Sequence, residues 1–187
     1  SLLVFMGDVT GHGVGPAMVT SLVYGTFHMI KQIQQEKNSL DMNEIFEGIN
    51  SRLLELRGTP FWMTAAALHF NPGKKIVSVI VAGAPPVIHL QKGGSFNLHF
   101  DTSSVLGSGP LNLFTTTIPY KATDRLVLLT DGILEAPFLK GRDGMAATMK
   151  YLAPKDKALS VKDTCDKIRN IMIKNSRDDE EGDDKTL

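Results

Sequence analysis

The sequence predicts an α+β fold with antiparallel β-sheets. Helix-like spacing of apolar residues occurs near both ends of the chain, and the middle consists of short apolar segments separated by turns. Strands and helices do not alternate regularly, so a parallel sheet is not expected. We expect one domain over residues 1–187. We expect this domain to lack its first strands and the end of its last strand, because the chain starts and stops within strand-like segments.

Three helices and a first strand are predicted outside the central region. Residues 2–8 form an apolar run that is typical of a buried strand. A long helix is expected over 14–36, with Pro16 in its first turn, where proline is tolerated. One apolar face of this helix consists of Val14, Met18, Leu22, Met29 and Ile33. Residues 40–56 predict a second helix that Asp41 could cap, and 161–173 predict a third, with Ile168, Ile171 and Met172 facing inward.

The central strands are predicted from apolar segments and the turns that join them. The sequence "NPGKK" places proline and glycine as a tight turn requires, and "QKGG" is a second turn of this kind. Pro85 and Pro86 interrupt the chain between the two hairpins. The expected strands cover 61–70, 76–81, 87–90, 96–100, 113–120 and 125–129.

Composition excludes several classes of protein. Lys+Arg and Asp+Glu are both 20, so no basic face for nucleic acid is expected. No apolar run is long enough to span a membrane, so we expect no membrane contact from this segment. The single cysteine, Cys165, excludes an internal disulfide, and we expect a cytoplasmic domain. A membrane anchor elsewhere in the parent protein and a homodimer both stay open.

Acidic residues beside glycines are the chemically informative feature. Asp8 ends the first strand, Asp131 follows the run "RLVLLT", and Asp183 and Asp184 precede a strand-like segment at the end of the chain. Carboxylates that are brought together repel each other, and Mg²⁺ or Mn²⁺ offsets this repulsion. An Asp-Gly pair is also an ordinary turn, and an acidic tail is also an ordinary solvated segment. Spacing alone therefore indicates only a potential acidic metal site.

The residues around Asp8 carry the strongest signal. Gly7, Gly11, Gly13 and Gly15 surround it, more glycines than one tight turn needs, and they would let the backbone expose its carbonyls. His12 lies among them and is as consistent with a turn residue as with a catalytic one. Strand, glycine-rich turn and helix also match a dinucleotide-binding pattern, but Pro16 stands where its third glycine or alanine belongs.

Five motifs resemble the metal-dependent protein phosphatases, and more narrowly their bacterial SpoIIE-like branch. The segment "GDVTGHGVGPAM" resembles the GDVSGHG-type motif of the family, and "LLTDGILEA" is similar to TDG-[LIV]-x-E-A. The other three are "VAGAPPVIHL", "SVLGSGP" and "GDDKTL", which are similar to the A-G-H-P-P, x-L-G-[IL] and D-D-x-T segments. They occur in the family's order across essentially the whole chain, so the combination is specific.

This resemblance implies that the α+β fold consists of two packed antiparallel β-sheets flanked by helices, an α-β-β-α sandwich. It also implies a hydrolase of phosphoserine or phosphothreonine on a signalling protein, such as a regulator in a bacterial sigma-factor pathway. It implies two Mn²⁺ or Mg²⁺ ions and a metal-bridging hydroxide that attacks phosphorus. Asp8 would bridge both ions, Val9 would contribute its backbone carbonyl, and Asp131 and Asp183 would bind metal. Asp8 and Asp131 are thus the catalytic residues expected, with His12, Asp184 and Gly132 as further candidates.

Two departures from the family pattern keep an alternative open. Ala84 stands where the branch usually has histidine, and the upstream G-G-D-x-x-D segment lies before the first residue of this sequence. The alternative is a catalytically impaired phosphatase fold that binds a partner in a signalling protein. Retention of all three metal-site aspartates favours the enzyme.

Overall fold

A computed structural model describes residues 1–56, 61–92, 95–100, 103–134 and 160–175 of the chain. The chain divides into two compact units. The first unit consists of Ser1–Ala84 and Phe100–Pro119, and the second of Pro85–His99 and Tyr120–Leu187.

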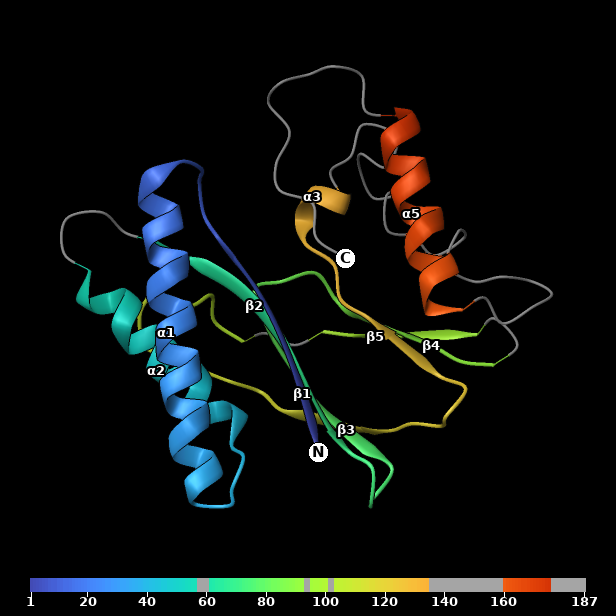
Figure 1. Ribbon diagram of the computed structural model, residues 1–187, viewed down its shortest axis with the longest axis horizontal. Helices are drawn as coiled ribbons and strands as arrows, with labels where there is room; N and C mark the ends of the chain where they lie inside the picture. Colours follow the sequence, from blue (N-terminus) through green and yellow to red (C-terminus); the bar gives the residue numbers. More distant parts are fainter. Residues whose placement is uncertain (57–60, 93–94, 101–102, 135–159, 176–187) are drawn as a thin grey trace. The chain divides into compact units, whose positions relative to one another are not determined.

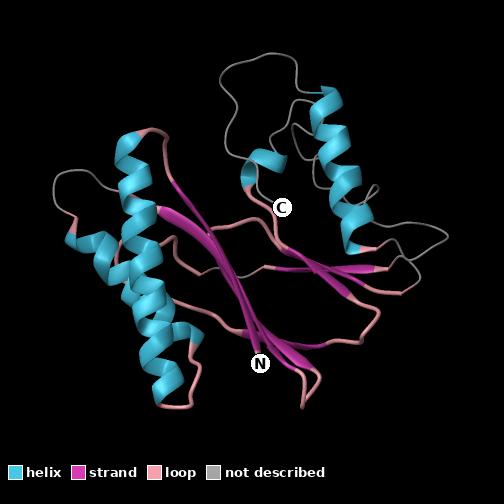
Figure 2. Ribbon diagram, viewed as in Figure 1, coloured by secondary structure: helices cyan, strands magenta, loops and turns pink. Residues whose placement is uncertain are grey.

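The first unit is a four-stranded antiparallel sheet with two long helices (Figures 1 and 2). Its strands occur in the order β1-β2-β3-β6, and each hydrogen-bonds to its neighbour. The two helices follow β1 directly in the chain and lie together beside the sheet (Figure 1). The element bounds are β1 Leu2–Val9, α1 Val14–Glu36, α2 Met42–Glu55, β2 Met63–Asn71, β3 Ile76–Ala82 and β6 Thr116–Pro119.

Alternation along the strands gives the sheet one face toward the helices. On β2, Met63, Ala65 and Ala67 belong to the same apolar cluster as the buried residues of α1 and α2. Phe46 of α2 is fully buried at the centre of this cluster, and Phe5 of β1 contacts its ring edge to face. The side chains between them point to the opposite face of the sheet. Those on β2 and β3 are buried as well: Ala66, Leu68, Val77, Val79 and Val81.

The predicted helix 14–36 is confirmed, but the apolar face named from its spacing is the exposed one. Met18 and Val14 are 69% and 78% exposed, and the other three residues of that face are also exposed. The buried residues of α1 are instead Val19, Val23, Thr26, Ile30 and Gln34. Apolar residues occur on both faces of α1, so packing against the sheet determines which face is buried. The buried face includes two polar side chains.

Hydrogen bonds satisfy those two buried polar side chains. Thr26 donates its hydroxyl to the carbonyl of Leu22, one turn earlier in the helix. Gln34 bonds to both backbone groups of Asp41 and to the carboxylate of Glu44 in α2. Asp41 caps α2 as predicted, because its carboxylate accepts the N–H of Asn43. Gln34 therefore joins the end of α1 to the start of α2.

The second unit contains a three-stranded antiparallel sheet in the order β5-β4-β7. Ile88 and Leu90 of β4 pack with Leu129 and Ile133 in a small apolar core. The side chains of β4 are all buried, so this strand lies at the centre of its sheet. The element bounds are β4 Val87–Leu90, β5 Phe96–His99, β7 Arg125–Val127, α3 Asp131–Leu134 and α5 Val161–Asn175.

The α+β class with two antiparallel sheets is confirmed. Seven predicted strands and three predicted helices are present, although several strands are shorter at their ends. The last central strand, predicted over 125–129, ends at Val127. The inward side chains predicted for 161–173 lie outside the described residues, although the helix itself is present. Within the described part of the chain, no helix has the length and apolar character that a membrane crossing requires.

Candidate metal and catalytic site

Asp8 lies near the end of β1, on the sheet face that points away from the helices. Leu3, Phe5 and Val9 pack against the helical core, so the alternating side chains of β1, including Asp8, point to the opposite face. Asp8 pairs in register with Thr64 of β2 and is half-buried. The fold therefore places this carboxylate on the face of the sheet that its own helices do not cover.

The backbone N–H and C=O groups of Val9 point away from β2. Met63, its partner in register, exchanges both backbone hydrogen bonds with Leu106 on the other side, at 3.0 Å each. Val9 and Met63 are therefore a non-hydrogen-bonded pair, in which neither residue directs its N–H or C=O to the other. The carbonyl of Val9 consequently faces the outer side of β1. Among the described strands, β1 is the first of its sheet, with β2 as its one neighbour.

The turn after β1 is fixed by the residue pair Thr10 and Trp62. The N–H and the hydroxyl of Thr10 both donate to the Trp62 carbonyl, and the same hydroxyl accepts the Trp62 N–H. Gly11 and Gly13 then adopt φ values of +89° and +92°, which side chains rarely permit. His12 lies between them and is exposed. Only glycine lets the chain turn this sharply from Asp8 into α1.

Asp131 begins the short helix α3 in the second unit. Its carboxylate accepts the N–H of Gly132 at 3.0 Å, and it is half-buried. Leu129 and Ile133 on either side are fully or almost fully buried, so core packing fixes the backbone around it. The strand before Asp131 is shorter than predicted, because β7 ends at Val127, four residues before Asp131, and Asp131 itself starts a helical turn.

The predicted site residues are divided between the two units. Asp8 and Val9 belong to the first unit, and Asp131 and Gly132 belong to the second. Asp183 and Asp184 lie outside the described residues. Within the described ranges, no three His, Cys, Asp or Glu side chains are grouped as a metal site would require. The donors that are described are carboxylate and carbonyl oxygens, which fit Mg²⁺ and Mn²⁺ and not a softer metal.

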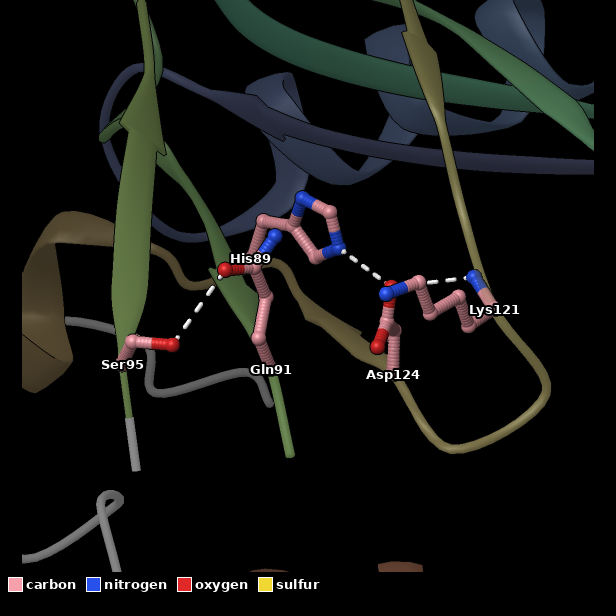
Figure 3. Close-up of polar contacts among 5 residues, drawn as sticks. All are labelled: His89, Gln91, Ser95, Lys121 and Asp124. Atoms are coloured by element: carbon pink, nitrogen blue, oxygen red, sulfur yellow. Dashed lines mark hydrogen bonds and ion pairs between the residues drawn. The ribbon is translucent and has the colours of Figure 1, made fainter. Parts of the chain in front are cut away.

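A buried His–Asp pair in the second unit was not predicted. His89 Nε2 lies 3.0 Å from Asp124 Oδ2, and the two side chains are 3% and 5% exposed (Figure 3). Burial raises the pKa of Asp124, but hydrogen bonds from the Lys121 N–H and from His89 outweigh burial and hold this pKa below its usual value. The signal in the sequence is a histidine inside the apolar strand "VIHL".

A buried asparagine in the first unit was also missed. Asn50 of α2 is 5% exposed, and its amide bonds the loop that contains Gly107 and Gly109. Its sequence signal is a polar residue directly beside Ile49, on the face that Ile45 and Leu53 also form. Helical spacing alone does not distinguish such a residue from an ordinary boundary position.

Comparison with known proteins identifies the family. The family model described as stage II sporulation protein E (SpoIIE) matches residues 1–187. The chain belongs to the SpoIIE family. No protein with a curated description matches this sequence.

Solved structures agree with this membership of the SpoIIE family. The RsbU and RsbW domains of Rv1364c from Mycobacterium tuberculosis are 22% identical, with a TM-score of 0.72 over 92% of this chain and 47% of that one. The PP2C phosphatase domain with a regulatory fragment of Bacillus subtilis SpoIIE is 15% identical, with a TM-score of 0.73 over 93% and 49%. RsbX in complex with magnesium is 18% identical, with a TM-score of 0.62 over 93% and 73%. At these identities the structures show a shared PP2C-type fold, and this chain spans about half the length of the first two.

Proposed function

We propose that this chain is the catalytic domain of a metal-dependent phosphatase that removes phosphate from serine or threonine on a signalling protein. Membership of the SpoIIE family supports the reaction class. The observation that carries the proposal is the end of β1, where a carboxylate and the next residue's carbonyl are presented together. Asp8 points to the sheet face away from the helices, and the carbonyl of Val9 points away from β2.

In this proposal Asp8, Val9 and Asp131 supply oxygen ligands, and Asp183 is the expected fourth contributor. Two bound Mn²⁺ or Mg²⁺ ions would lower the pKa of water and neutralise charge on the phosphoryl group. The protein's own task is to hold these oxygens in place. The Thr10–Trp62 bonds fix the turn after Asp8, and the buried neighbours Leu129 and Ile133 fix the backbone at Asp131.

The substrate is proposed by analogy with the structural relatives. One of them joins RsbU and RsbW domains in a single protein, and another is a cell-fate determinant. A phosphorylated regulator in a sigma-factor or similar signalling pathway is therefore the substrate class we propose. We assign no arginine as the residue that binds the phosphate. Arg125 begins β7, and this position alone does not indicate that role.

The dinucleotide-binding alternative does not fit the observed topology. In that pattern the strand, glycine-rich turn and helix lead into a parallel neighbouring strand. Here β1 pairs antiparallel with β2, and two consecutive helices separate them. The glycine-rich turn after Asp8 therefore belongs to a different architecture.

Phosphate release from p-nitrophenyl phosphate and from a phosphoserine protein tests the proposal. We expect activity with Mn²⁺ and a loss of at least about 100-fold in Asp8→Asn and Asp131→Asn, because each removes a charge that is worth several kcal/mol in the transition state. Asp166→Asn, an exposed aspartate of α5, is the matched control and should keep full activity. A chain that binds Mn²⁺ and a phosphoprotein but releases no phosphate would favour the binding-module alternative.

A further inference from the structure

Asn50 clamps the loop that follows Ser103 to helix α2. Its Oδ1 accepts the N–H of Gly107 at 2.7 Å, and its Nδ2 donates to the carbonyl of Gly109 at 3.1 Å. Both ends of one amide are therefore used on two backbone groups that lie two residues apart. Asn50 is 5% exposed, so water does not easily replace these bonds.

The loop is closely fitted against α2 at the same place. Gly107 has a φ of +82°, and a Cβ at this position would collide with the carbonyl of Phe61 and lie 3.2 Å from Cβ of Leu53. Leu53 is three residues after Asn50 on α2, so both residues face the loop from one side of that helix. The loop therefore has little freedom to move without α2.

Backbone hydrogen bonds connect this loop to the end of β1. Leu106 is fully buried and exchanges two backbone bonds with Met63, which starts β2. Met63 pairs in register with Val9, and Trp62 bonds to Thr10 on the other side of Val9. Asn50, the loop, the start of β2 and the end of β1 thus form one continuous set of contacts within the first unit.

We propose that Asn50 is a positioning residue that sets the placement of the Asp8 carboxylate and the Val9 carbonyl for a divalent cation. This inference rests on the proposed function of that site. The loop Leu106–Gly109 is the outer neighbour of Met63, so its position determines where Met63 lies beside Val9. Asn50 acts through these backbone bonds, and two residues on the path from Asn50 to Val9, Leu106 and Met63, are buried.

The first test uses the unaltered chain and needs no variant. Amide hydrogen exchange is followed by NMR with and without saturating Mg²⁺, which is diamagnetic and leaves the amide signals near the site visible. Coupling between two sites is reciprocal, so Mg²⁺ at Asp8 should slow exchange of the Gly107 N–H. Mg²⁺ binding that protects residues around Val9 and leaves Gly107 unchanged would overturn the inference.

The second test uses Asn50→Asp and Asn50→Leu, with Asn43→Asp and Asn43→Leu as matched controls. Asn43 is an exposed residue of the same helix. Calorimetric titration should show Mn²⁺ binding that is about 10-fold weaker in both Asn50 variants, the lower range for outer residues that orient metal ligands. Exchange of Gly107 N–H should be faster in Asn50→Leu, which removes its acceptor. The Asn43 variants should bind Mn²⁺ as the unaltered chain does.

Different measurements would refute the proposed function and the positioning role of Asn50. If the unaltered chain binds no Mn²⁺, the proposed function fails, and the inference fails with it. If the unaltered chain binds Mn²⁺ and folded Asn50 variants bind it equally well, the positioning role is refuted and the proposed function stands. Asn50→Asp keeps the side-chain volume and the acceptor for Gly107, so it is the variant of choice if Asn50→Leu does not fold.

Discussion

Replacing Gly107 with alanine gives the sharpest test of how the loop is packed. The residue has a φ of +82°, and an alanine in this region is destabilised by about 1–2 kcal/mol. The added Cβ would also collide with the Phe61 carbonyl and press on Leu53 at 3.2 Å, and overpacking of this kind costs about 1–3 kcal/mol. We therefore expect Gly107→Ala to lower the free energy of unfolding by about 2–5 kcal/mol.

Gly11→Ala is the matched control for backbone strain. Its φ of +89° is similar, but the nearest atom to an added Cβ is Cγ of Pro16 at 3.5 Å, an ordinary contact. Urea unfolding of both variants, analysed at equal m-values, separates strain from collision. Gly11→Ala should lose only about 1–2 kcal/mol. Equal losses in the two variants would refute the reasoning, because the contact with Phe61 would then have no energetic consequence.

Three further predictions concern stability. Phe46→Ala should lower the free energy of unfolding by about 3–5 kcal/mol, because Phe46 is fully buried. Leu54→Ala is the control on the same helix; Leu54 is 49% exposed, and its replacement should change this free energy by less than about 1 kcal/mol. Similar losses in the two variants would contradict the assigned core. Gly25 lies in an open part of α1, so Gly25→Ala should raise the free energy of unfolding by about 0.5–1 kcal/mol. A decrease in the free energy of unfolding would mean that other atoms contact this exposed face of α1. Burial and the nearby His89 lower the pKa of His99 below 6.5, so the unfolded chain binds this proton first as the pH falls. Stability should therefore fall as the pH drops below about 6.5, and His99→Gln should reduce that slope in pH-dependent urea unfolding; an identical slope would contradict the assignment.

The sequence predicts the elements of this fold well because periodicity is a local property. The strand ending near Asp8, the capped start of α2 at Asp41 and the central hairpins all follow from apolar spacing and turn residues. Helix α1 shows the limit. Both of its faces carry apolar residues, and only the sheet decides that Val19 and Val23 are buried and that Met18 is exposed.

The candidate site could be predicted only in part, because some of its contacts are decided by the fold and not by local sequence. Asp8 is marked by its glycines, and the positive φ values of two of them, Gly11 and Gly13, show that the turn needs glycine at those positions. Asn50 and His89 carry no comparable signal: His89 is a single histidine within an apolar strand, and Asn50 stands between Ile49 and Ser51 like an ordinary boundary residue of a helix. Their roles come from partners 57 and 35 positions away in the chain, which only the folded structure brings into contact.

We propose that Asp8 and Asp131 hold the same divalent ions. Paramagnetic broadening by Mn²⁺ tests it most directly, because the ion weakens the NMR signals of amides near it. If the ions are shared, the amide signals of Val9 and Gly132 are lost together at the same low ratio of Mn²⁺ to protein. Loss of one signal while the other persists to saturation would contradict a shared metal centre.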